Sequence, residues 1–188
     1  MLKKQLRLPR GGLGLLLGAL CGRSRTLHEQ SHSFIGLYGA TPILMTKIHI
    51  PGDTQEAVRR PRLIDRLNEG MRGKVSFVCA PAGFGKTTLL EHWASQSPIR
   101  PAWFSIDQGD NDLSRFWQYV VSSIDWLHLG FSERAGDVLK LIRPEQYELA
   151  LTMLVNELHS PAEPIALVMD DFHTIADASL LASFVIFH

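Results

Sequence analysis

Residues 80–87 constrain the fold more than any other stretch of the sequence. They read Ala-Pro-Ala-Gly-Phe-Gly-Lys-Thr, which fits the [Gly/Ala]-x4-Gly-Lys-[Ser/Thr] form of a phosphate-binding loop, with Ala80 where the stricter pattern has glycine. An apolar run at 74–79 predicts a buried strand before the loop, and Leu89, Leu90 and Trp93 predict a helix after it. This context favours a P-loop (Walker A motif) over a simple glycine turn.

Each part of the loop has a role in holding phosphate. Gly83 and Gly85 let the backbone turn its N–H groups toward an anion, and the following helix N-terminus adds its dipole. Lys86 is expected to reach the β- and γ-phosphates, and the Thr87 hydroxyl to ligate Mg²⁺. The predicted nucleotide-binding residues are therefore Ala80, Pro81, Ala82, Gly83, Phe84, Gly85, Lys86, Thr87 and Thr88.

A second motif lies at residues 165–171. Five apolar residues precede Asp170 and Asp171, which predicts a buried strand with carboxylates at its C-terminal end, where ligands lie in open α/β sheets. As a Walker B motif, Asp170 would hold Mg²⁺ through water, and Asp171 would orient or deprotonate an attacking water. The predicted catalytic residues are Asp171 and Lys86, and the predicted metal ligands are Thr87 and Asp170.

The rest of the chain from residue 45 alternates helices and strands, which predicts an α/β fold with a parallel sheet. Helices are expected near 60–67, at 112–127 with Asp112 as N-cap, and at 144–158; a strand is expected at 101–106. In the 144–158 helix, Leu149, Met153, Leu154 and Leu158 are expected to point inward. Arg115 is expected to pair with Asp112 or Asp107 rather than to contact nucleotide.

Charge and cysteine content exclude several classes of protein. Nineteen basic and nineteen acidic residues cancel, so no global electrostatic argument favours nucleic acid. The two cysteines, Cys21 and Cys79, form no metal-binding or disulfide pattern, which fits a reducing, cytoplasmic location.

The first 44 residues differ from the rest. Basic residues precede Gly11–Leu20, a run of only Gly, Leu and Ala that is too short to span a membrane and fits a signal peptide poorly. We expect residues 1–44 to be a disordered or mis-started extension, dispensable for folding, with Met45 the natural start. His28, Glu29 and His32 match the zinc-protease pattern H-E-x-x-H, but we interpret this as a chance match.

With both motifs placed, residues 46–175 resemble the start of the large ATP-binding LuxR-type transcription regulators, which are signal-transducing P-loop ATPases. The resemblance implies ATP as the nucleotide, Lys86 and Thr87 on phosphate and Mg²⁺, and Asp170 on the metal. It also implies that Arg60 and Arg62 lie near the adenine and ribose. The stretches that support it are Thr46–Pro51, Arg60–Leu67, Ala80–Leu90, Trp103–Asp107, Asp110–Phe116 and Leu167–His173.

The same resemblance predicts what is missing. Members of that family also have a sensor strand, a winged-helix region, helical repeats and a DNA-binding helix-turn-helix, and none follows His173 here. We therefore expect a three-layer P-loop NTPase fold, in a partial domain at 45–188, that is incomplete at its C-terminus. Ser183–Phe187 follows Asp171 too closely for a crossover helix. The strand between the Walker A and Walker B strands would then be absent, and the unpaired edges would favour poor stability and self-association.

The predicted function is that of an Mg·ATP-binding fragment of a transcription regulator's ATPase, with slow hydrolysis if any. ATP is the expected partner, with no DNA or membrane binding by the chain itself. Two alternatives remain open: a P-loop small-molecule kinase, for which no arginine-rich lid segment is visible, and a non-functional truncated remnant.

Overall fold

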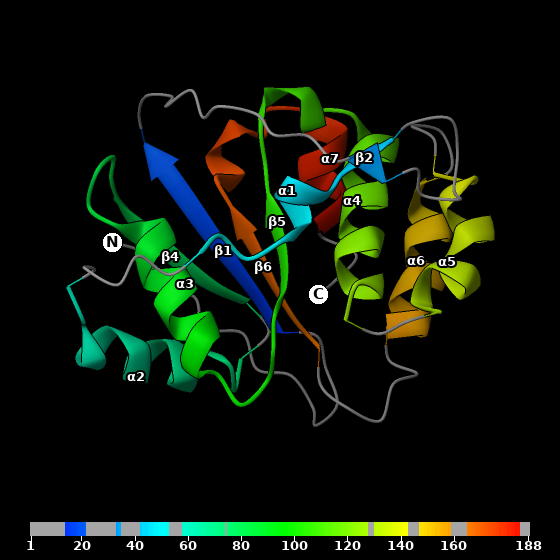
Figure 1. Ribbon diagram of the computed structural model, residues 1–188. Coiled ribbons are helices and arrows are strands. Elements are labelled where there is room, and N and C mark those ends of the chain that lie inside the picture. Colours follow the sequence, from blue (N-terminus) through cyan, green and yellow to red (C-terminus); the bar gives the residue numbers. More distant parts are fainter. Residues whose placement is uncertain are drawn as a thin grey trace.

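The computed structural model describes residues 14–21, 33–34, 42–52, 58–73, 75–127, 130–142, 147–158 and 165–184. A four-stranded parallel sheet lies at the centre, with the strand order β4-β1-β6-β5 (Figure 1). Its strands are β1 (Gly14–Cys21), β4 (Val75–Pro81), β5 (Ala102–Ser105) and β6 (Ala166–Asp170). A small antiparallel pair joins β2 (Ser33–Phe34) to β3 (Ile43–Leu44). The predicted α/β class with a parallel sheet is confirmed.

Most predicted helices form close to their expected limits. The Asp112 carboxylate accepts the backbone N–H of Arg115, so Asp112 is the N-cap of its helix, as expected. The helix at Phe131–Leu139 was not predicted. The helices are α1 (Met45–Ile48), α2 (Pro61–Gly70), α3 (Lys86–Gln96), α4 (Leu113–Asp125), α5 (Phe131–Leu139), α6 (Tyr147–Leu158) and α7 (Ala178–Ser183), with 3-10 turns η1 (Gln108–Asp110) and η2 (Phe172–Thr174).

Helices pack on both faces of the sheet because strand side chains alternate between its faces. Trp103 and Val168 pack with α2 and α3 on one face. Phe104 and Leu167 pack with the helices α4 to α7 on the other (Figure 1). Both faces of β5 and β6 are therefore buried, which explains their continuous apolar sequences.

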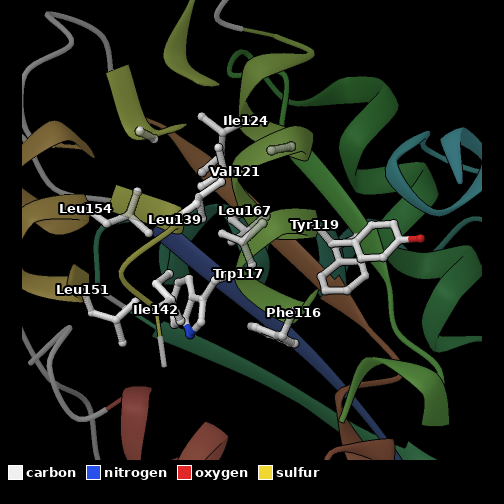
Figure 2. Close-up of a cluster of buried hydrophobic side chains, with 14 of the residues drawn as sticks. Phe116, Trp117, Tyr119, Val121, Ile124, Leu139, Ile142, Leu151, Leu154 and Leu167 are labelled. Carbon is white, nitrogen blue, oxygen red and sulfur yellow. The ribbon is translucent and has the colours of Figure 1, made fainter. Parts of the chain in front are cut away.

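The larger of the two cores centres on α4. Figure 2 shows Phe116, Trp117 and Tyr119 of α4 gathered with Leu151 and Leu154 of α6. The Trp117 indole N–H donates to the Ser183 hydroxyl at 3.3 Å, which ties α7 to the same core. This packing holds α4, and with it the loop that joins β5 to α4, firmly against the sheet.

The inward face of α6 lies one residue away from the predicted one. Ala150 and Leu151 are buried together with Leu154 and Leu158, whereas Leu149 and Met153 are exposed. Because all of these positions are apolar, the sequence alone did not distinguish the two faces. Ser183, the first residue of the segment that follows Asp171 too closely for a further crossover, is the buried last residue of α7, and residues 185–188 lie outside the described part.

The largest difference from expectation concerns the N-terminal residues. Gly14–Cys21 forms β1, and β1 lies between β4 and β6, whereas the sequence predicted a disordered or mis-started extension over residues 1–44. The expected central gap in the sheet is wrong, because β1 pairs with both neighbours. Ile43, before the proposed start at Met45, is buried in the larger core. The segment His28–His32 lies outside the described residues.

The structure bears only in part on two further expectations, which concern self-association and membrane binding. The strand β4 forms one edge of the sheet, and its Phe77 side chain is 65% exposed, so self-association through a sheet edge stays a prediction. Among the described helices, none has the length and apolar character needed to cross a bilayer.

Candidate functional site

The loop between β4 and α3 has the backbone shape that its glycines predict. Gly83 has φ 80° and Gly85 has φ 69°, both in the left-handed region, where a side chain is strained and glycine is not. Gly85 is the N-cap of α3, so the unpaired N–H groups of the helix's first turn lie at the loop. A loop and helix N-terminus of this kind form a site suited to an anion.

Lys86 is turned back over this loop. Its ammonium Nζ donates to the carbonyl oxygens of Ala80 at 2.7 Å and Pro81 at 2.6 Å. The residue is only 4% exposed. An ammonium group has three N–H donors, so these two bonds anchor the group beneath the loop and leave one donor for a further acceptor.

The loop meets the end of β6 at Thr87 and Asp170. The Thr87 hydroxyl donates to the carboxylate of Asp170, which is 4% exposed. Burial raises the pKa of Asp170 to about 6, and the charge of Asp171 adds to the rise. The hydrogen bonds from Thr87 and from the Asp171 backbone, with the charge of Lys86, oppose this rise in pKa. Both predicted metal ligands are thus adjacent, although they lie far apart in the sequence.

Asp171 combines backbone strain with an unsatisfied oxygen. Its φ of 57° makes it the one non-glycine residue with positive φ in the described part of the chain. Its Oδ1 is buried without a hydrogen-bond partner, and His173 Nδ1 lies 3.9 Å away, too far for a hydrogen bond. Burial raises the pKa of Asp171, opposed by His173 and Lys86. Strained residues and unpaired buried oxygens of this kind are typical of functional sites.

These oxygens fit a magnesium ion better than a zinc ion. Mg²⁺ is usually held by one or two carboxylates together with phosphate oxygens and water, and Asp170, Thr87 and the free Oδ1 of Asp171 are oxygen donors of that kind. Over the described ranges, no group of three His, Cys, Asp or Glu side chains is placed to hold a metal. The donor set therefore suits a hard cation that shares its ligands with a phosphate.

Of the two arginines of the predicted site, Arg60 contacts the loop through a hydrogen bond and Arg62 does not. Arg60 Nη1 donates to the Phe84 carbonyl at 3.0 Å, which places Arg60 against the loop. Arg62 is exposed in the first turn of α2, and among the described residues no hydrogen bond or ion pair joins it to the loop. Ala82 and Phe84 are exposed at the loop, and Thr88 is half-buried in the first turn of α3.

Sequence reasoning missed the loop after β5 as a support of this site. Lys47 Nζ binds Asp110 at 2.6 Å, and Arg115 Nε binds the same carboxylate at 3.2 Å. The Arg115 side chain therefore pairs with Asp110 in place of the expected Asp107 or Asp112, and Asp112 binds only the Arg115 backbone N–H. Asn111 reaches across to the turn after β6, where its Oδ1 accepts the Ala176 N–H at 2.7 Å. The sequence Asp-Asn-Asp at 110–112, all side chains that cap turns, was the available signal.

No protein-family model matches the chain. It is 33% identical over 176 residues to the serine/threonine-protein kinase PknK of Mycobacterium tuberculosis, an alignment that covers 89% of this chain. It is 28% identical over 135 residues to the HTH-type transcriptional regulator MalT of Cronobacter sakazakii and 29% identical over 139 residues to that of Yersinia pestis, covering 72% and 73% of this chain.

The chain spans only a small share of these relatives: 16% of PknK and 15% of each MalT protein. The PknK alignment covers 89% of the chain, which is more than residues 45–188 account for. The alignment therefore extends into residues 1–44. Part of the N-terminal segment is therefore shared with a curated relative.

Proposed function

The chain is a homologue of the MalT-type transcriptional regulators, and from that premise we propose that it binds ATP with Mg²⁺ in a P-loop NTPase fold of three layers. The MalT relatives are transcriptional regulators by name. For this chain, we propose the part of such a regulator that responds to nucleotide, with ATP holding one conformation and slow hydrolysis releasing it.

One observation supports the proposal above the others: the Thr87 hydroxyl donates to the buried Asp170 carboxylate. A hydroxyl that follows a P-loop lysine and a carboxylate at the end of another strand of the same sheet are the two protein ligands that a nucleotide-bound Mg²⁺ uses. A purely structural glycine turn explains neither the burial of this carboxylate nor its pairing with the loop. When bound, the metal would neutralise charge on the phosphates.

We assign roles to the remaining residues of the site from their positions. The backbone N–H groups of Gly83 and residues 85–88 would donate to the phosphates, and the third N–H of the Lys86 ammonium would donate to a phosphate oxygen. Arg60, bound to the Phe84 carbonyl, lies where the base and ribose would leave the loop, and Arg62 follows two residues later in the first turn of α2. Asp171 Oδ1, buried and without a partner, is the acceptor that orients a water for hydrolysis.

The test is a calorimetric titration of ATP with Mg²⁺ into the wild-type chain and into Lys86→Ala. Losing hydrogen bonds to a charged phosphate costs about 1.5–3 kcal/mol each, which is about ten- to 150-fold in affinity. Lys140→Ala is the matched control, because Lys140 is exposed on α5's C-terminal side and pairs with Asp137. We expect Lys140→Ala to bind as the wild type does. Equal affinities for Lys86→Ala and wild type, with both proteins folded, would remove the assignment.

A further inference from the structure

The strands that precede the two motifs do not pair with each other. In the described sheet, β1 lies between β4 and β6 and pairs in parallel with both. Leu17 is the register partner of Phe77 on one side and of Met169 on the other. The position of the loop after β4 relative to Asp170 at the end of β6 therefore depends on β1.

The position of β1 is unusual for its place in the sequence. Its C-terminal half runs beside Cys79, Ala80 and Pro81, the residues that lead into the loop. A strand in the middle of a sheet uses its N–H and C=O groups on both sides, and without it β4 and β6 would each present an unpaired edge. Residue composition alone did not predict this, because Gly11–Leu20 lacks the alternation of a half-buried strand.

We propose that the space between β4 and β6 is a binding site for one extended apolar strand in parallel orientation, and that Gly14–Cys21 is its occupant. We call this space the strand site. The strand site does not require that its occupant be continuous with residue 45, so the same segment binds there as a separate peptide.

The proposal goes beyond nucleotide binding and partly rests on it. Occupation of the strand site sets the distance between the Lys86 loop and Asp170, so a chain with an empty strand site has no assembled nucleotide site. Pairing of β1 with β4 and β6 does not depend on the proposed nucleotide. Experiments on this pairing therefore test the strand site separately from nucleotide binding.

Cross-linking tests the register directly. Ala19 is the register partner of the native Cys79, and paired strands lie about 4.8 Å apart, within the range of Cα separations that a disulfide spans. In a Cys21→Ala background, Ala19→Cys should form an intrachain disulfide with Cys79 under mild oxidation. The control Leu20→Cys has Ala80 and not Cys79 as its register partner, so it should not. Equal cross-linking of both variants, or none in either, would overturn the proposal.

A second experiment tests exchange of the strand. Proline cannot donate within a central strand, so Leu17→Pro should remove amide exchange protection from β4 and β6 in the full chain, whereas Lys4→Pro, outside β1, should not. A peptide of residues 7–22 added to Leu17→Pro should restore that protection, and the same peptide with the Leu17→Pro change should not. If Leu17→Pro is insoluble, the peptide is added during refolding, and recovery of soluble monomer is measured.

The results separate the proposals. Wild-type protection of β4 and β6 in Leu17→Pro, or no restoration by the peptide, would overturn the strand site whatever the chain does with ATP. Restored protection without ATP binding would leave the strand site intact and contradict the proposed function alone.

Discussion

The side-chain amide of Asn111 donates to the Thr174 carbonyl at 2.8 Å, and so joins the loop after β5 to the turn after β6. The Asn111 Oδ1 accepts the backbone N–H groups of Ala176 at 2.7 Å and Asp177 at 3.2 Å. Thr174 in turn donates its backbone N–H and its hydroxyl to the Asp171 carbonyl, each at 3.0 Å. Asn111 therefore fixes the backbone that holds Asp171 in its left-handed conformation.

Replacing Asn111 should loosen this turn. Asn111→Ala loses these three hydrogen bonds and a fourth, from its amide to the Gln108 carbonyl at 3.2 Å. At about 0.5–1.5 kcal/mol each, we expect the free energy of unfolding to fall by about 2–6 kcal/mol. Asn111→Asp keeps the acceptor and loses the donor to Thr174, and should fall between Asn111→Ala and wild type. Urea denaturation measures all three, with Asn156→Ala, at an exposed site on α6, as the matched control. If Asn111→Ala lowers the free energy of unfolding no more than Asn156→Ala does, the contacts of Asn111 with the turn after β6 do not stabilise the fold.

The buried carboxylate of Asp110 should depend on Lys47. Asp110 is fully buried and binds Lys47 Nζ, Arg115 Nε and the backbone N–H of Asp107 at 2.9 Å. Lys47→Met removes the nearest cation and leaves the buried carboxylate with Arg115 as its ion-pair partner and the Asp107 backbone N–H. Loss of one partner of a buried ion pair typically costs about 3–5 kcal/mol. Thermal melting should show a large drop in Tm for Lys47→Met.

The control for this prediction is Lys140→Met, because Lys140 forms an exposed ion pair with Asp137 and such pairs contribute little. Similar melting temperatures for Lys47→Met and Lys140→Met would mean that Asp110 is not held by this contact.

Local signals in the sequence predicted the loop, the strands before both motifs and the N-cap of α4, because each rests on neighbouring residues. Pairings between segments far apart in the sequence could not be predicted from these local signals. The place of β1 depends on which strands lack partners, and the contacts of Asn111 and Asp110 join segments more than 60 residues apart. The prediction of the inward face of α6 was wrong for a different reason, since apolar residues such as Leu149 and Leu151 lie on both sides of that helix.

The ionisation of Asp170 should make wild-type stability depend on pH. Its pKa is about 6 in the folded chain against a usual 3.8. Between these values the folded chain keeps a proton that the unfolded chain has released, so the free energy of unfolding should fall as pH rises from about 4 to about 6 and then level off. Asp170→Asn cannot ionise. It should exceed wild type by about 2–3 kcal/mol at about pH 8 and match it near pH 4.

Urea denaturation of both proteins at about pH 4, 6 and 8 checks this prediction, because other titrating groups largely cancel in the difference. A variant less stable than wild type at about pH 8 would show that the carboxylate stabilises the fold and that burial is not the dominant influence on its pKa.

The central claim is that the loop and Asp170 form one site for Mg·ATP, and the effect of Mg²⁺ on ATP affinity tests it most directly. ATP is titrated into wild type and into Asp170→Asn at about pH 8, each with Mg²⁺ and with a chelator. Because Asp170 and Thr87 are the proposed protein ligands, Mg²⁺ should tighten ATP binding to wild type and have little effect on ATP binding to Asp170→Asn. An equal gain from Mg²⁺ in both folded proteins would contradict the account.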